Sequence, residues 1–224
     1  MKQKYLSWCR YMIILSIFFF PILVLASAQN YFHEGMQWVG KGFSTAYPNG
    51  GEYWVLYQIC RQSDNEQLSL YRYSFSDQTG DNSVFICYIK TEGDKVYFNQ
   101  YDDSIPKWNL MYDFGLKPGE GCYVYSPLNY NLKRPRKPVR EYMVCTDIHP
   151  DPDNPEWKIM EMEVYHEEDS EKPWDKGRWI KGLGSEMDVD RSNAFHLEGG
   201  GTDLIQVYDN DKLIYSNIGT THIP

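Results

Sequence analysis

Short apolar or alternating stretches, separated by turn-forming residues, recur along the chain and constrain its fold more than any other feature. Successive side chains of a β-strand point to opposite faces, so alternation is typical of a strand with one buried face. Strands at this spacing indicate a sandwich or a barrel, and we find no convincing amphipathic helix longer than a few turns. We expect strands over residues 36–41, 52–61, 68–75, 83–91, 95–101, 108–114, 121–126, 140–146, 158–166, 178–183, 203–208 and 212–216.

Two junctions have the composition of tight hairpin turns. Gly93, in the segment 91–94, can take the positive φ that such a loop needs. Near the end of the chain, the Asp-Asn-Asp segment 209–211 contains residues that tolerate left-handed conformations. Consecutive hairpins favour an antiparallel meander. The sequence therefore predicts an all-β fold, an antiparallel meander that is barrel-like or a sandwich, with few or no helices after residue 28.

Strand parity predicts which side chains face the core. In the expected strand 158–166, Met160 and Met162 share one face while Glu161 and Glu163 share the other. The two carboxylates would lie ~6.5–7 Å apart, near the spacing of an inverting glycosidase pair. Because such pairs normally come from different elements that line a cleft, we interpret these two glutamates as a solvated strand face.

The first 28 residues carry the pattern of a secretory signal peptide. Lys2, Lys4 and Arg10 form a basic start, an apolar run follows over residues 12–25, and Ala26-Ser27-Ala28 resembles a cleavage site. The sequence thus predicts a signal peptide over residues 1–28 and a single β-rich domain over 29–224. The mature protein would be periplasmic, on the cell surface or extracellular, without stable membrane insertion after cleavage.

An uncleaved membrane anchor is the alternative to this leader. The apolar run is shorter than the about 20 residues that a spanning helix needs, and Pro21 interrupts it. A lipoprotein would carry Cys directly after the cleavage site, where Gln29 stands, so lipid anchoring is not expected. By length, the rest of the chain forms one ordinary domain.

Charge and aromatic content limit the classes of partner. The leader holds three of the 22 basic residues and none of the 31 acidic ones, so the mature chain has a net charge of −12. Such a chain repels phosphate backbones and anionic membrane surfaces, which argues against nucleic-acid binding. The 19 Tyr and 7 Trp are read first as cross-strand packing; a stacking surface for sugars or peptides is the alternative.

The mature chain holds four cysteines, Cys60, Cys87, Cys122 and Cys145. An even number in an exported protein permits two disulfides with three connectivities. Each cysteine, however, lies in an apolar run, where a free thiol behaves as a small buried hydrophobe. Both interpretations stay open. The sequence contains no C-x-x-C motif, so nothing points to a redox pair or a zinc knuckle.

Three irregular polar segments lie between the expected strands. A basic, proline-containing segment covers residues 132–138, a proline-rich surface excursion covers 149–155, and an acidic segment covers 167–175. Two acidic loops could offer oxygen ligands to calcium, but neither fits a known calcium template, and solvation explains them better. Their residues are Asp147, Asp151 and Asp153 in one loop and Asp188, Asp190 and Asn193 in the other.

The histidines form no H-E-x-x-H, and no serine-hydrolase elbow is present, so we assign no catalytic, cofactor or metal residue.

Four motifs stand in the last 130 residues: KVYF (95–98), LMYDFGLKPGE (110–120), RWIKGLGS (178–185) and DNDKLIY (209–215). In this order they resemble the pattern KVYY…LLYDFNLKVGD…WIEGIGS…DNGELIY, which is typical of a group of uncharacterised secreted proteins of Bacteroidota. The resemblance implies export and β architecture but no reaction. The motifs also have a structural reading: Pro118-Gly119 suits a type II turn, and Gly182 and Gly184 would mark a strand that ends in a close backbone approach.

We therefore expect a non-enzymatic binding or interaction module of the bacterial envelope or exterior. Its ligand would be a glycan, a peptide or an envelope protein. One alternative is a secreted glycan hydrolase that uses carboxylates brought together by folding. A second is a structural subunit that pairs through exposed strand edges.

Overall fold

The computed structural model describes residues 31–44, 51–61, 67–75, 82–99, 107–127, 139–168, 170–186 and 200–217. The chain divides into two compact units, 1–30 and 31–224, and all described residues belong to the second. These residues form strands and turns and contain no helix. The leader, the basic segment 132–138 and the acidic loop with Asp188, Asp190 and Asn193 lie outside the described residues.

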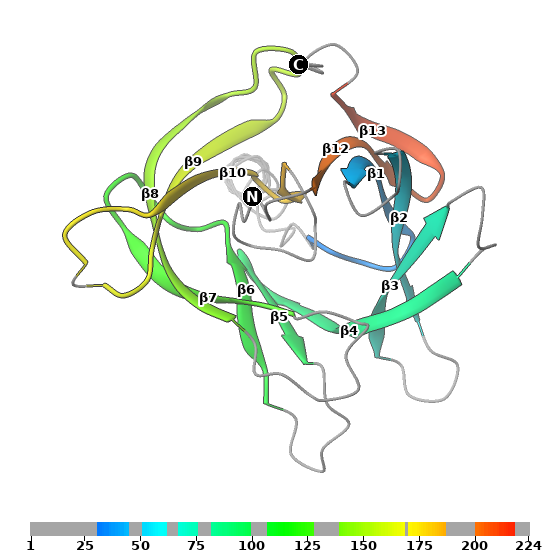
Figure 1. Cartoon of the computed structure of the whole chain (residues 1–224), viewed down its shortest axis with the longest axis horizontal. Helices are drawn as coiled ribbons and strands as arrows, with labels where there is room; N and C mark the ends of the chain where they lie inside the picture. The colour runs from blue at the N-terminus through cyan, green and yellow to red at the C-terminus, as the bar shows by residue number, and fades with distance from the viewer. Residues whose placement is uncertain are drawn as a thin grey trace, which may run out of the picture. The chain divides into compact units, whose positions relative to one another are not determined.

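The strands form two antiparallel sheets (Figure 1). The larger sheet has the order β13-β12-β1-β2-β3-β4-β5-β6. Its strands are β1 (Met36–Ser44), β2 (Gly51–Arg61), β3 (Leu68–Phe75), β4 (Asn82–Glu92), β5 (Lys95–Asn99), β6 (Asn109–Asp113), β12 (Gly200–Asp209) and β13 (Lys212–Ser216). The smaller sheet has the order β11-β10-β9-β8-β7. It consists of β7 (Gly121–Ser126), β8 (Val139–Pro150), β9 (Lys158–Tyr165), β10 (Asp175–Ile180) and β11 (Gly184–Ser185).

The chain runs through both sheets as a meander that returns to its beginning. Strands that follow one another in sequence are neighbours within each sheet, and β12 pairs with β1. Where the small sheet ends, the amide of Leu204 donates to the carbonyl of Glu186 at 2.8 Å, which links β12 to the residue after β11. The all-β antiparallel meander is thus confirmed, in the form of two curled half-barrels (Figure 1).

The tight turns follow the chemistry of their residues. Gly93 adopts φ 60°, and Asn210 and Asp211 adopt φ 47° and 64°, so both predicted hairpins are confirmed. At the predicted type II turn, Gly119 has φ 88°, and the amide of Glu120 donates to the carbonyl of Lys117 at 2.9 Å. The sequence predicted the positions of these turns correctly, because each turn needs a residue that tolerates positive φ.

Strand β8 is longer than predicted and includes the first two residues of segment 149–155, while most of the remaining residues of this segment are exposed in the β8–β9 connection. The strand continues through Pro150, after a bulge between Cys145 and Asp147. Asp151 follows it and is 5% exposed. Its carboxylate accepts hydrogen bonds from the amide of Asp153 at 2.9 Å and from the hydroxyl of Tyr215 at 3.1 Å. The acidic residue is therefore a buried acceptor that holds the turn against β13.

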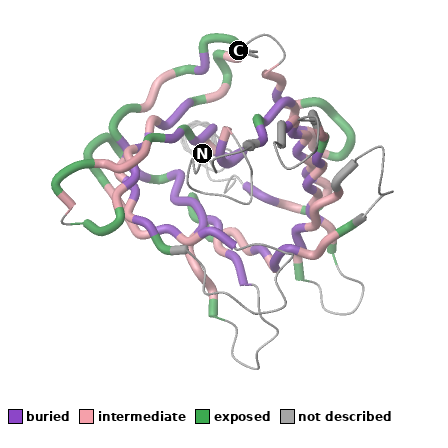
Figure 2. Tube along the Cα trace, in the orientation of Figure 1, coloured by how far each residue is buried: buried purple, intermediate pink, exposed green. Residues whose placement is uncertain are grey.

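One hydrophobic core lies between the two sheets. The predicted inward face of β9 is confirmed, since Met160 and Met162 are buried while Glu161 and Glu163 are partly exposed. Buried positions alternate with partly exposed ones along the strands (Figure 2). Pattern alone therefore located the core face of this strand.

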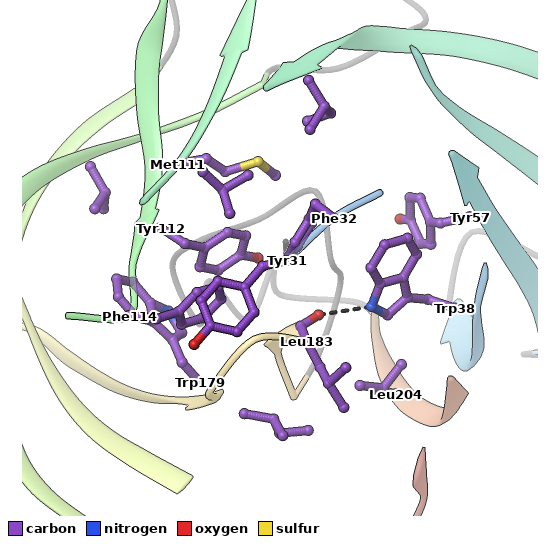
Figure 3. Close-up of a cluster of buried hydrophobic side chains, with 14 of the residues drawn as sticks. Tyr31, Phe32, Trp38, Tyr57, Met111, Tyr112, Phe114, Trp179, Leu183 and Leu204 are labelled. Atoms are coloured by element: carbon purple, nitrogen blue, oxygen red, sulfur yellow. Dashed lines mark hydrogen bonds between the residues drawn. The ribbon is translucent and has the colours of Figure 1, made fainter. Parts of the chain in front are cut away.

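An aromatic cluster occupies the centre of this core (Figure 3). Tyr112 and Phe114 stack with ring centroids 5.3 Å apart, and Trp179 meets Tyr112 edge-on at 5.2 Å. Trp38 donates its indole N–H to the carbonyl of Leu183 at 2.7 Å. Since Trp38 belongs to β1 and Leu183 lies between β10 and β11, this buried hydrogen bond joins the two sheets.

Residues 31–32, which precede β1, also enter the core. Phe32 is 1% exposed, with its ring 5.0 Å from Trp38 and 5.6 Å from Tyr112. Tyr31 lies against Gly182, where an added Cβ would come 2.6 Å from the tyrosine ring. Gly182 also has φ 89°. The sequence predicted a close backbone approach here, whereas the structure places the side chain of Tyr31 against Gly182.

The four cysteines in the described part of the chain are free thiols. Cys87 and Cys145 are buried, and Cys60 and Cys122 are partly exposed. Burial raises the pKa of Cys122 to about 12, with Asp113 as a further cause. These four cysteines therefore form no disulfide with one another and pack as buried or partly buried apolar side chains.

Replacing Gly182 by Ala tests the contact with Tyr31, and Gly93→Ala is its matched control. Both glycines have positive φ, so each substitution is expected to cost about 1–2 kcal/mol from the backbone. Only Gly182 has a neighbour within 4 Å of the new methyl group, which adds roughly 1–3 kcal/mol. Denaturant unfolding of both variants measures the difference.

Tyr31→Ala in the Gly182→Ala background completes the test. Removing the ring should bring the cost of Gly182→Ala down to that of Gly93→Ala. Equal destabilisation by both glycine variants in the unaltered background would contradict the close contact.

Candidate functional site

The solvent side of the large sheet carries a band of aromatic side chains across β2–β6. Alternation produces it, because Val55, Leu70 and Val96 turn inward and their neighbours in sequence turn outward. We call this surface the aromatic face and define it by Trp54, Tyr71, Tyr73, Phe85, Tyr88, Tyr97 and Trp108, of which Trp54 is exposed and the others are partly exposed.

Cross-strand register brings the rings of this face together. Tyr71 of β3 pairs directly with Phe85 of β4, and their ring centroids are 5.8 Å apart in an edge-to-face arrangement. Phe85 in turn lies 5.0 Å from Tyr88. At the β2 end, Trp54 is 44% exposed. The rings support one another and still present aromatic surface to solvent.

Two lysines lie over rings at opposite ends of the aromatic face. The Lys41 ammonium is 5.8 Å from the centroid of Trp54. The Lys90 ammonium is 5.1 Å from that of Tyr97 and 4.9 Å from that of Trp108. These are cation–π distances. Lys90 also forms an ion pair with Glu92 at 2.7 Å, so the two rings and this carboxylate together hold its ammonium group in place.

The floor of the aromatic face is chemically inert. Ser69 lies in register between Cys60 and Tyr88, and its hydroxyl is buried without a hydrogen-bond partner among the described residues. Burial first, and then Glu34, raises the pKa of the Cys60 thiol, which keeps it protonated. Burial likewise raises the pKa of Tyr73. The face therefore offers rings and neutral hydroxyls rather than a nucleophile.

The solvent side of the small sheet differs because its charges pair with one another. Glu161 accepts from the Arg178 guanidinium at 3.1 Å and contacts His149 Nε2 at 3.2 Å. Arg178 also reaches Glu186 at 3.5 Å. Burial raises the pKa of Glu186, and Arg178 opposes that rise. The guanidinium of Arg178 thus bridges two carboxylates.

Glu163 has partners of its own on the same face. It accepts from the Tyr165 hydroxyl at 2.9 Å and forms an ion pair with Lys176 at 3.5 Å. Glu161 and Glu163 therefore do not converge on a shared cleft. The interpretation of these glutamates as an outward-facing strand surface is confirmed.

The acidic segment 167–175 is held against the same sheet. Glu167 accepts from Arg140 at 2.6 Å and from the Tyr123 hydroxyl at 2.9 Å. The Arg140 guanidinium also lies 4.5 Å from the centroid of the Tyr123 ring. These contacts tie the β9–β10 connection to β7 and β8, so this acidic segment has a structural role.

The candidate calcium ligands in the described part of the chain do not converge. Asp147 lies in β8, where its carboxylate accepts from the amide of Ile148 at 2.8 Å, whereas Asp151 bonds to Tyr215. Among the described residues, His, Cys, Asp and Glu form no group of three or more that could hold a metal ion.

The aromatic face was not assembled from the sequence as a site, although one signal pointed to it. Tyr71 and Tyr73 lie two residues apart and so share a face. Phe85 and Tyr88 are three apart, and strict alternation places such residues on opposite faces. A bulge where β3 pairs with β4 restores them to one surface.

Comparisons with protein-family models, with curated proteins and with solved structures find no match for this chain. In the part of the chain that the structure describes, no helix has the length and apolarity needed to cross a membrane.

The contacts of His149 predict its titration. Its Nδ1 lies 2.9 Å from the Pro150 carbonyl oxygen, and its Nε2 contacts Glu161. Two acceptors favour the doubly protonated ring, so the Pro150 carbonyl first and the Glu161 carboxylate second raise the pKa above its ordinary 6.5. The small stabilisation that results is present below that value and is lost as the pH rises through the higher pKa of the folded state.

An NMR titration of the His149 ring measures this shift. Glu161→Gln should lower the pKa of His149, because it removes the charged acceptor. Glu163→Gln is the matched control, since this neighbour on the same strand face pairs with Lys176 instead. Equal effects of the two variants would contradict the assignment.

Proposed function

We propose that this protein is a non-enzymatic binding module and that the aromatic face is its ligand surface. The observation that carries the proposal is the set of partly exposed rings on β2–β6, in which Tyr71, Phe85 and Tyr88 contact one another and Trp54 is 44% exposed at one end. Contiguous apolar patches on a protein surface mark interaction sites more often than scattered exposed residues do. Tyr and Trp supply large contact areas at low entropy cost, which suits such a surface.

A carboxylate-dependent hydrolase receives less support from the described residues. An inverting pair needs room for a water between the acid and the base. Glu161 and Glu186 are instead bridged by Arg178, at 3.1 Å and 3.5 Å. A guanidinium in that position neutralises both groups and occupies the space between them.

Pairing through the edge of β13 also receives less support. The indole N–H of Trp157 donates to the carbonyl of Ile214 at 3.0 Å, and the Asn154 amide donates to that of Ser216 at 3.0 Å. Both carbonyls lie on the side of β13 that faces away from β12, because Asn217 donates toward β12. Side chains from the β8–β9 connection therefore occupy the acceptors that a partner strand would need.

We further propose that the module acts outside the cytoplasm. The signal-peptide pattern of residues 1–28 supports export, and the resemblance to secreted Bacteroidota proteins agrees with it. Four free thiols are compatible with this location because burial protects two of them and raises the pKa of the others. A glycan, a peptide or an envelope protein would then be the available ligands.

Trp54→Ala tests the aromatic face, and Leu213→Ala is the matched control. The two side chains are similarly exposed, at 44% and 46%, but Leu213 lies on β13. Titration of a panel of glycans and peptides, followed by tryptophan fluorescence and calorimetry, first identifies a binder. Trp54→Ala should then weaken binding about tenfold, as loss of an exposed aromatic anchor does, while Leu213→Ala leaves it unchanged. Equal loss in both variants would place the ligand elsewhere.

A further inference from the structure

We infer that the ligand of the aromatic face is an uncharged polysaccharide, a chain of sugar rings whose polar groups are hydroxyls. This inference rests on the proposed function, because it names the ligand class of the same surface. Three features of the described residues support it: the direction in which the rings run, the side-chain amides beside them, and the pairing of the charges at the border of the face.

The rings of the aromatic face follow a diagonal across the sheet. The diagonal starts on β2 and ends on β5, and its rings in order are Trp54, Tyr73, Tyr71, Phe85, Tyr88 and Tyr97. From the strand spacing and the rise per residue, it is roughly 30 Å long. An extended polymer that lies along this diagonal contacts ring after ring, whereas a small molecule covers only part of it.

Two glutamine side chains lie in register beside the middle of the diagonal. Gln58 of β2 pairs with Tyr71 on one side and with Gln37 of β1 on the other. Both glutamines are partly exposed and stand between buried neighbours in sequence, so their side chains point to solvent. Neither amide forms a hydrogen bond with another residue in the part of the chain that the structure describes. An amide carries a donor and an acceptor, as a sugar hydroxyl does, so each glutamine can bind hydroxyls in both directions.

The charged side chains that border the aromatic face are matched by groups of opposite sign. The pairs are Lys90 with Glu92 at 2.7 Å, Lys95 with Asp113 at 3.3 Å, Arg61 with Glu34 at 3.0 Å, and Lys41 with Asp203, its partner in register. A ligand with charges of one sign would have to displace these pairs, whereas an uncharged ligand leaves them intact. The net charge of −12 on the mature chain would in addition repel an acidic polymer.

An apolar partner fits this surface less well than a hydroxylated one. The tyrosine hydroxyls and the amides of Gln37 and Gln58 lie among or beside the rings. A partner without polar groups would bury them without hydrogen bonds, which costs free energy. Sugars combine an apolar C–H face with hydroxyls around the ring, so they supply both the apolar contact and the hydrogen bonds that this surface can use.

An extended peptide also fits less well, because it usually adds to a sheet edge through backbone hydrogen bonds. The backbone groups of β3 and β4 are already paired within the sheet. The aromatic face therefore contacts its ligand through side chains alone, which suits a polymer that needs ring and hydroxyl contacts rather than a new strand.

The test uses laminarin, galactomannan and pullulan, which are uncharged, and the same polymers after oxidation of their primary hydroxyls to carboxylates. The full-length mature chain should bind at least one of the uncharged polymers, and oxidation should weaken that binding about threefold or more, because the face offers paired charges and the chain is acidic. Added NaCl should change the affinity for the uncharged polymer by less than about twofold, since no ion pair forms with it.

Gln58→Leu tests the amide, and Gln206→Leu is the matched control. Leucine keeps the size of the side chain and removes its hydrogen bonds, so Gln58→Leu should weaken binding to the uncharged polymer roughly three- to tenfold. Gln206 pairs with Val39 on the same side of the sheet, but its Oε1 already accepts from the Tyr208 hydroxyl at 2.9 Å. Its replacement should therefore leave the affinity unchanged. Denaturant unfolding of both variants shows that each one is folded.

The outcomes separate this inference from the proposed function. Tighter binding of an oxidised polymer, a strong loss of affinity in NaCl, or equal effects of the two glutamine variants would overturn the uncharged ligand, as would absence of binding to all three uncharged polymers. The aromatic face stays the binding surface in each of these cases if another ligand binds and Trp54→Ala weakens it. A ligand whose affinity is unchanged in both Trp54→Ala and Tyr71→Ala would overturn the inference and the proposed function together.

Discussion

The hydrogen bond from the Trp38 indole to the Leu183 carbonyl connects the two sheets at the centre of the core. A buried carbonyl without a partner costs about 1–3 kcal/mol, so the orientation of Trp38 is tied to the turn that follows β10. That turn requires Gly182, whose φ of 89° brings the carbonyl of Leu183 toward β1. Phe32 packs against the indole ring, with the two ring centroids 5.0 Å apart. A second buried hydrogen bond, from the amide of Ser185 in β11 to the hydroxyl of Tyr112 in β6 at 3.2 Å, also joins the sheets. Polar contacts therefore help to fix the register of the aromatic cluster between the sheets.

The same strands supply two aromatic populations with different roles. On β2, Tyr57 turns inward and is 2% exposed, while Trp54 turns outward and is 44% exposed. Inward rings have aromatic neighbours from other segments, as Tyr112 of β6 has in Phe32, which precedes β1, and in Trp179 of β10. On the outward side, Tyr71 contacts Phe85, and the Lys41 ammonium lies over Trp54. The high aromatic content thus divides between packing, which the sequence favoured, and a surface, which it left as the alternative.

Most of the fold was predictable because alternation and turn chemistry are local. Met160 and Met162 were assigned correctly to the core, and Gly93 and Asn210 to turns. Bulges caused the main errors. The extension of β8 past Thr146 follows a bulge that shifts its register, and no local pattern announces where an extra residue enters a strand. The two-residue strand β11 exists only through its pairing with β10, which is a long-range property.

A bulge also explains why the aromatic face escaped prediction. Ile86 and Cys87 are adjacent in sequence, yet both are buried, so the alternation of β4 changes phase between Phe85 and Tyr88. Had the strand been regular, one of these two aromatic residues would point into the core. The bulge instead keeps both outside, where their rings lie 5.0 Å apart. Register shifts also occur where β1 pairs with β12, β12 with β13, β5 with β6 and β8 with β9. The shift in β4 is thus one of several, and its particular consequence is that two aromatic side chains stay on the solvent side of the sheet.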